Sequence, residues 1–191
     1  MNIIHLKITG TRPLLMHNGR LADALDPAAK RLKALTGKRN KTDDDYLAIS
    51  RVEWDGGLYI DDDGVFIPGE NVERCIRDAA RMSKDGKKIE RGVRVIEDMR
   101  LDIGDSPKTA DALWSHRSGR HVHRRSARVG MSKVPRTRPV FPEWCGVIEL
   151  AADDSVIDSV DVIRYATTAG RYIGVGDWRG RFGTFKVEEL T

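Results

Sequence analysis

The sequence predicts an α+β fold whose core has the order strand, helix, strand, strand, helix, strand, the ferredoxin-like or RRM-like arrangement. Three observations lead to this prediction. Apolar and polar residues alternate from Ile4 to Ile8, as in a half-buried strand. Two amphipathic segments, 72–82 and 156–169, have the spacing of helices with one apolar side. Short apolar runs at 93–96, 145–150 and 184–187 supply the remaining strands.

Between the first strand and the first core helix, the sequence predicts two more helices and a hairpin. The first helix covers 27–35: Asp26 is a good N-cap, Pro27 suits the first helical position and Gly37 suits the end. The second covers 43–54, with Tyr46, Leu47, Ile49 and Val52 on its apolar side. Apolar triplets at 58–60 and 65–67 flank an Asp-Gly turn and predict a β-hairpin.

After the hairpin, Pro68-Gly69-Glu70-Asn71 begins the first core helix, whose buried side comprises Cys75, Ile76, Ala79 and Ala80. A helix start presents free N–H groups to an anion, and Arg74 and Arg77 follow on the next turns. We expect a basic turn at 84–88, an extension of the strand at 99–103 and a polar connection at 107–113.

A strongly basic segment interrupts the second half of the core. The whole chain of 191 residues carries a net charge of only +4, whereas 114–143 holds eight cations and one acid, Glu143. Arginine outnumbers lysine there, which favours phosphate binding because guanidinium pairs with phosphate through two hydrogen bonds. We predict a basic, β-rich insertion at about 105–144, the basic arm, whose cations are Arg117, Arg120, Arg124, Arg125, Arg128, Lys133, Arg136 and Arg138.

A glycine-rich stretch separates the last helix from the last strand. It contains Gly174, Gly176, Gly180 and Gly183 together with Trp178, Arg179, Arg181 and Phe182. Glycine permits close approach of another molecule, arginine binds phosphate and an aromatic ring stacks on a base. The alternative is a helix end at Gly170 followed by a tight turn, with Trp178 buried in the core.

Two motifs resemble the RAMP (repeat-associated mysterious protein) superfamily, which includes the backbone subunits of CRISPR effector complexes. Residues 66–77 are similar to the start of that superfamily's first core helix, although Glu70-Asn71 replaces its usual serine pair, and 174–183 resembles its glycine-rich loop. The basic arm occupies the place of the protruding thumb hairpin of such subunits. The chain is similar to small standalone members from phages and prophages. The resemblance implies one RAMP-like domain over 1–191, whose copies bind a strand side by side.

Catalysis by histidine or aspartate is the main alternative to binding. His17, His116, His121 and His123 have side chains that titrate near neutral pH, as RNA cleavage by acid–base chemistry requires. Some RAMP proteins cut RNA with an aspartate after the first strand, where this chain has Asp23, Asp26 and 43–45. We interpret Asp26 and 43–45 as helix starts and the histidines of the arm as surface groups.

The sequence therefore predicts a non-catalytic protein that binds single-stranded RNA or DNA and forms homo-oligomers, without cofactor, metal or membrane partner. Two alternatives remain: a RAMP-type endoribonuclease, and a phage protein that mimics or inhibits a CRISPR backbone subunit. Cys75 and Cys145 are expected to be free thiols in a cytoplasmic protein. The predicted nucleic-acid-binding residues are Arg74, Arg77, the eight cations of the basic arm, Gly174, Gly176, Trp178, Arg179 and Arg181.

Overall fold

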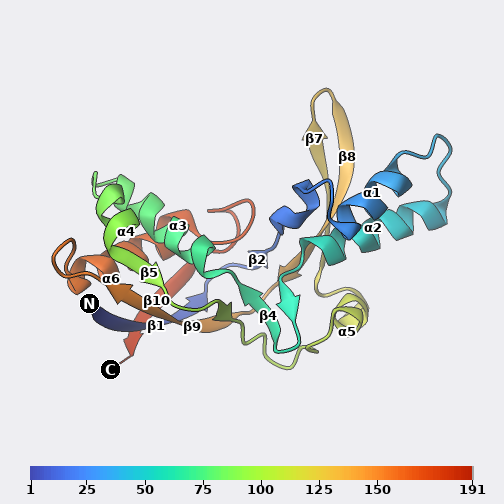
Figure 1. Cartoon of the computed structure of the whole chain (residues 1–191). Helices are drawn as coiled ribbons and strands as arrows, with labels where there is room; N and C mark the ends of the chain where they lie inside the picture. The colour runs from blue at the N-terminus through green and yellow to red at the C-terminus, as the bar shows by residue number, and fades with distance from the viewer. Residues whose placement is uncertain (191) are drawn as a thin grey trace.

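The computed structural model describes residues 1–190 and shows a mixed α+β protein with antiparallel sheets and, in that range, six α-helices (Figure 1). The main sheet has four strands in the order β10-β1-β9-β5, and each neighbouring pair is antiparallel. Its strands are β1 (Asn2–Gly10), β5 (Val93–Val95), β9 (Cys145–Ala152) and β10 (Phe185–Leu190). Ile4, Leu6 and Ile8 are buried, which confirms the alternation predicted for the first strand.

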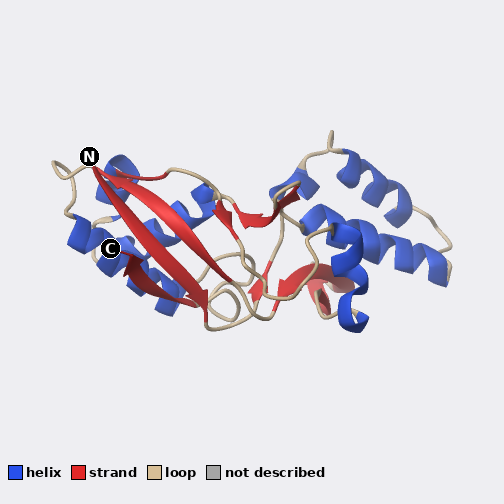
Figure 2. Cartoon of the chain, turned by 90° about the horizontal axis from the view of Figure 1, so that it is seen from below, coloured by secondary structure: helices blue, strands red, loops and turns tan. Residues whose placement is uncertain are grey.

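Helices cover one face of the main sheet and leave the other face open (Figure 2). The two core helices, α3 (Gly69–Arg81) and α6 (Ser159–Thr168), contact each other. The predicted buried side of α3 is confirmed, since Cys75, Ile76, Ala79 and Ala80 are all inaccessible. A helix not predicted, α4 (Gly86–Gly92), begins where we expected only a basic turn. The open face carries the outward residues of alternate strand positions, including Lys7, Val147 and Glu188.

The remaining elements form a second group beside this sheet (Figure 1). One small sheet, β2-β8-β7, is antiparallel and contains β2 (Leu14–Leu15), β7 (Val122–Val129) and β8 (Ser132–Phe141). Another, β3-β4-β6, contains β3 (Ile60–Asp61), β4 (Gly64–Ile67) and β6 (Met99–Arg100). The helical elements are η1 (Gly19–Ala22), α1 (Pro27–Thr36), α2 (Asp43–Gly57), α5 (Ala110–Ser115) and η2 (His116–Ser118).

Several predicted boundaries are wrong. Residues from Met99 do not extend β5, because β6 pairs with β4 in a different sheet. The connection at 107–113 contains the start of α5. Within the basic arm, β7 and β8 form one continuous hairpin, and α5 and η2 precede it. On α2, Tyr46 and Leu47 are exposed, because the buried side of that helix lies near its C-terminal end, at Val52 and Trp54.

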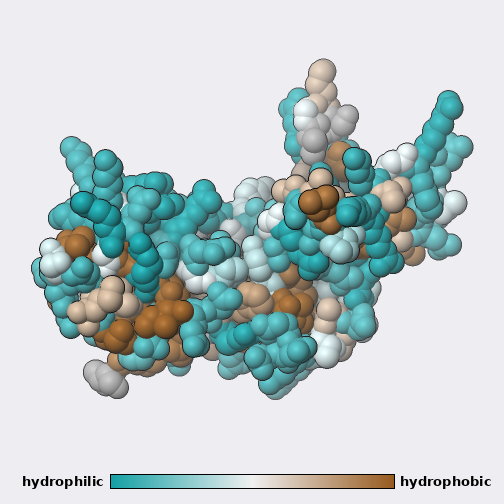
Figure 3. Space-filling model, in the orientation of Figure 1, coloured by the Kyte–Doolittle hydropathy of each residue, from teal (hydrophilic) through white to brown (hydrophobic). Residues whose placement is uncertain are grey.

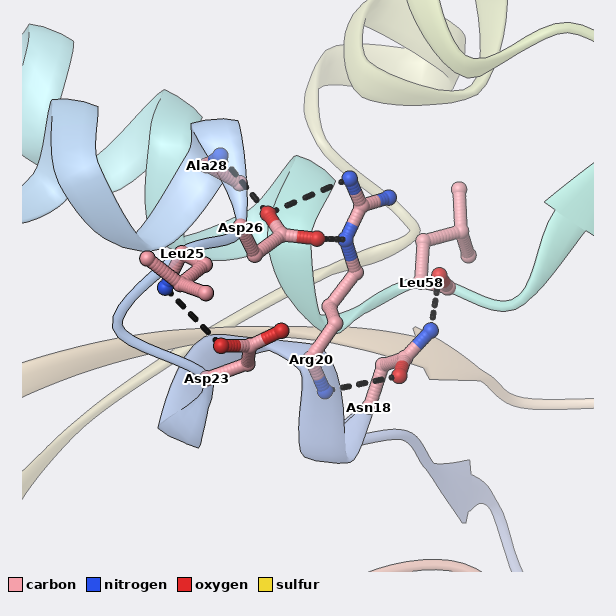
Figure 4. Close-up of polar contacts among 7 residues, drawn as sticks. All are labelled: Asn18, Arg20, Asp23, Leu25, Asp26, Ala28 and Leu58. Carbon is pink, nitrogen blue, oxygen red and sulfur yellow. Dashed lines mark hydrogen bonds and ion pairs between the residues drawn. The ribbon is translucent and has the colours of Figure 1, made fainter.

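The N-cap predicted for α1 at Asp26 is confirmed, and Figure 4 shows its hydrogen bonds. Asp26 accepts a hydrogen bond of 2.7 Å from the backbone N–H of Ala28 and pairs with Arg20 at 3.0 Å. The hydrogen bond from Arg20 lowers the pKa of Asp26 below its ordinary value. Asp23 accepts from the N–H of Leu25 at 2.8 Å. Both carboxylates are therefore engaged in shaping the chain between η1 and α1.

A buried carboxylate anchors the arm hairpin, β7 and β8, to α2. Glu53 is 5% exposed, and it accepts a hydrogen bond of 2.8 Å from Arg136 and one of 2.7 Å from the backbone N–H of Thr137. The neighbouring Trp54 donates from its ring N–H to the carbonyl of His121 at 2.8 Å. These contacts hold both strands of the hairpin at their base on one helix.

Between residues 1 and 190, no helix has the length and apolarity needed to cross a membrane. Cys75 and Cys145 are both free thiols, as expected, but only Cys75 is buried.

The Glu53 contacts predict a graded loss of stability. Replacing Glu53 by Ala leaves the buried N–H of Thr137 without an acceptor, and we expect this to lower the free energy of unfolding by about 2–3 kcal/mol. Glu53→Gln keeps an acceptor oxygen and should cost less. Urea unfolding of the two variants and the unchanged protein measures both values. Equal losses in the two variants would contradict the role given to the acceptor oxygen.

Candidate nucleic-acid interface

The glycine-rich loop, defined here as 174–183, lies where the two groups of elements meet (Figure 1, the red loop beside α3). It follows the wide helical turn η3 (Ala169–Ile173) and precedes β10. Its backbone is bonded to the chain around β2: the N–H of Asp177 donates to Leu15 at 2.7 Å, and the N–H of Gly183 donates to Pro13 at 2.8 Å. These are main-chain bonds, so they fix the path of the loop independently of most of its side chains.

Two glycines of the loop are required by close backbone contacts. A Cβ atom on Gly176 would lie 2.4 Å from the carbonyl oxygen of Leu15, and one on Gly183 would lie 1.8 Å from that of Val175. Both residues also have positive φ, 81° and 69°, a conformation that costs other residues free energy. The interpretation of the stretch as a simple helix cap therefore fails, because several glycines are needed. Gly174 also has positive φ, of 77°.

Side chains connect the loop to the arm hairpin on one side and to α3 on the other. Asp177 pairs with Arg138 of β8. Arg179 pairs with Asp78 of α3 at 2.9 Å. The thiol of Cys75, also on α3, donates to the carbonyl of Gly174 at 3.1 Å, and burial raises its pKa to about 12. The loop is thus held between two elements that the sequence separates by about 60 residues.

Two hollows lie on either side of the loop. The α3 hollow has a volume of about 230 Å³, and its lining includes His17, Tyr59, Asn71, Arg74 and Arg179. The arm hollow has a volume of about 310 Å³, and its lining includes His123, Arg125, Arg128, Asp177 and Trp178. On the side seen in Figure 3 the surface over α3 is mostly hydrophilic, and the arm hairpin projects from the second group of elements.

Trp178 is the exposed aromatic residue of the arm hollow. Its side chain is 53% exposed, its backbone has a φ of 52°, and its ring stacks on Phe182 with the centroids 5.9 Å apart. The guanidinium of Arg181 lies 5.5 Å from the centre of the Trp178 ring. The alternative in which Trp178 is a core residue is therefore wrong. The ring is supported from one side and accessible to solvent.

The structure separates the predicted cations into two sets. Five of them form ion pairs: Arg77 with Glu90, Arg120 with Glu143, Arg136 with Glu53, Arg138 with Asp177 and Arg179 with Asp78. The others have no carboxylate within ion-pair distance among the residues described, and they are Arg74, Arg117, Arg124, Arg125, Arg128, Lys133 and Arg181. Arg124 faces away from the loop, since its guanidinium lies over Trp114 at 5.5 Å.

The start of α3 does not present a free anion site at its first residue. The N–H of Gly69 donates to the carboxylate of Asp98 at 2.9 Å. This acid precedes β6 and was not among the residues that sequence analysis assigned to the site. The predicted cation of the next turn, Arg74, is exposed and lines the α3 hollow.

The histidines of the basic arm are not all surface groups. His121 is 1% exposed; one ring nitrogen lies 3.0 Å from the carbonyl of Val140 and the other 3.0 Å from the hydroxyl of Ser106. Because a carbonyl only accepts, the nitrogen facing Val140 carries the proton in the neutral ring. Burial lowers the pKa of His121, so the neutral form is favoured. The prediction of a surface histidine is wrong at this position.

Two other histidines lie beside the loop. His123 contacts Phe182 edge to face at 5.4 Å, and its pKa is lowered by burial and by Arg125. His17 is an exposed residue of the α3 hollow, where partial desolvation and the charge of Arg138 lower its pKa. Within the described range, no group of three or more His, Cys, Asp or Glu side chains is arranged to hold a metal ion.

No protein-family model matches the sequence, and a search of curated proteins finds no significant match.

Two glycine substitutions separate the effect of backbone contact from that of positive φ. Gly176→Ala and Gly180→Ala both place a side chain at positive φ, which costs about 1–2 kcal/mol. Only Gly176→Ala creates a close contact, since a Cβ on Gly180 would meet nothing nearer than 3.8 Å. We expect a clearly larger fall in the unfolding free energy for Gly176→Ala, measured by urea unfolding. Equal losses would mean that the contact with Leu15 relaxes without cost.

Proposed function

We propose that this protein binds single-stranded nucleic acid along a path from the arm hollow, across Trp178, to the α3 hollow. The observation that carries the proposal is the exposed ring of Trp178, held on Phe182 within a hollow lined by Arg125 and Arg128. A solvent-accessible ring supported from behind offers a stacking surface to a base, and nearby guanidinium groups offer partners for phosphates.

The charges support a continuous path. Arg125, Arg128 and Arg181 lie around Trp178, and Arg74 lies in the α3 hollow on the other side of the loop. The ion-paired arginines Arg138 and Arg179 hold the loop in place between them. In this arrangement Arg138 and Arg179 build the surface, and Arg74, Arg125, Arg128 and Arg181 contact the ligand.

The main sheet supports a ferredoxin-like core, because its strand order β10-β1-β9-β5 has α3 and α6 as the helical connections. It also argues against base stacking on the open sheet face, which RRM domains use. That face exposes Lys7, Val147, Glu149 and Glu188, and no Phe, Tyr or Trp of β1, β5, β9 or β10 points to it. In the proposal the stacking ring is Trp178 of the glycine-rich loop, and copies of the protein lie side by side on the strand.

The endoribonuclease alternative has a defined location in the α3 hollow. His17 lies there beside Arg74, and its lowered pKa favours the neutral ring that a general base requires. Labelled RNA incubated with the protein decides between the two functions. Intact RNA supports binding alone, whereas cleavage that Glu149→Lys retains and His17→Ala abolishes would replace the proposal with catalysis.

Removing the cations around Trp178 should weaken binding and reduce its salt dependence. For single strands, log K changes with log salt by about −0.7 per neutralised phosphate, so loss of three contacts should reduce the slope by about 2. The variant is Arg125→Ala/Arg128→Ala/Arg181→Ala. Its control, Lys30→Ala/Arg31→Ala/Lys33→Ala, removes three exposed cations from α1. Fluorescence anisotropy with single-stranded RNA and DNA at several salt concentrations measures the slopes. Equal slopes for the two variants would refute the assigned path.

The stacking role of Trp178 predicts a specific loss of affinity. Trp178→Ala should weaken binding by about 5- to 150-fold, corresponding to roughly 1–3 kcal/mol per stacked base. Trp178→Phe should retain most of the affinity. Tyr46→Ala is the matched control, because Tyr46 is 51% exposed on α2. A Trp178→Ala variant that binds normally would show that the ring does not contact the ligand.

A further inference from the structure

The outer edge of β10 is available for pairing from Val187 onwards, whereas Gly170 of η3 lies against the carbonyl of Phe185 at the start of the strand. Within the described chain, β10 pairs only with β1 and is the last strand of its sheet. The N–H of Gly10 points towards β9, where it donates to the carbonyl of Trp144. Successive residues of an antiparallel strand point their peptide groups to opposite sides, so those of Thr9 and Lys7 point towards β10. Their partners are Lys186 and Glu188. The peptide groups of Val187 and Glu189 consequently point outwards.

The opposite edge of the sheet is closed by the chain itself. On β5, the outward N–H of Val95 donates to the carboxylate of Glu73 at 2.7 Å, and the N–H of Val93 donates to the carbonyl of Ile89. The N–H groups of Val187 and Glu189 have no such partner among the described residues. Natural proteins usually protect a free strand edge, because it pairs readily with another chain.

The surroundings of β10 are basic at the start of the strand and acidic at its end. Beside its first residues lies a hollow of about 560 Å³, whose lining includes Arg12, Arg171 and Lys186 and no carboxylate. Its last residues include Glu188 and Glu189, both exposed. An antiparallel partner strand with the same sequence would therefore place its acidic end beside the basic hollow, and would offer its own hollow in return.

We propose that two copies of this chain associate through antiparallel pairing of their β10 strands about a two-fold axis at Val187. In that register the two Val187 residues exchange N–H···O=C hydrogen bonds, and Lys186 of each copy lies opposite Glu188 of the other. The pairing joins the two main sheets into one. A two-fold contact of this kind closes on itself, so it differs from the head-to-tail contacts that a row of copies along a strand needs. It does not rest on the proposed function.

Charge reversal tests the register directly. Lys186→Glu places acids opposite acids, and Glu188→Lys places cations opposite cations, so each single variant should be monomeric in light scattering after gel filtration. Mixing the two variants should restore a dimer containing one copy of each, because every opposed pair is then complementary. The double variant Lys186→Glu/Glu188→Lys should dimerise with itself. Glu149→Lys, on the central strand β9, is the control and should remain dimeric.

Two results would overturn the proposal. One is an unchanged protein that runs as a monomer at all concentrations tested. The other is a dimer that both single variants retain, which would place the interface elsewhere. Thermal unfolding of each variant checks that the fold is kept. Anisotropy with single-stranded nucleic acid, run in parallel, distinguishes a failed dimer from failed binding, since the two surfaces use different residues.

Discussion

The close contact between the glycine-rich loop and the chain at 13–15 is the constraint on which the rest of the candidate site depends. Main-chain bonds from Asp177 and Gly183 hold the loop against Leu15 and Pro13, and the space left at Gly176 admits no side chain. This contact sets the loop between α3 and the arm hairpin. It therefore determines where Trp178 and Arg179 lie relative to Arg74, which is more than a hundred positions away in the sequence.

The arginines of the basic arm have two physical roles that their sequence does not distinguish. Arg136 and Arg138 pair with carboxylates of α2 and of the loop, and each of these carboxylates also helps to attach β8. Glu53 is the more buried of the two, and a buried carboxylate requires partners because an unpaired charge there is costly. Arg125 lies directly opposite Arg136 in the hairpin and Arg128 lies nearer its tip, and neither forms an ion pair with these acids. A net charge counted over the segment thus overstates the charge available to a ligand.

Local patterns predicted much of the fold. The caps of α1, the apolar side of α3 and the alternation of β1 follow from residues near one another in the sequence. The errors arise where distant residues decide the outcome. His121 is buried because Phe141, Ser106 and the carbonyl of Val140 surround it, and Tyr46 is exposed because only the end of α2 meets the core. The glycines, Trp178 and Arg181 of the loop were identifiable from composition, but the ion pairs of Arg179 and Arg138 were not.

Arg12 connects the two surfaces to which we assign partners. It lies in the hollow beside β10, and its guanidinium donates to the carbonyl of Gly180 at 2.8 Å. Its own carbonyl accepts from the ring N–H of Trp144, a residue packed on Phe185 of β10. An acidic chain end entering this hollow would face the same guanidinium that supports the glycine-rich loop. The edge of the sheet and the glycine-rich loop are therefore joined through one side chain and two main-chain carbonyls.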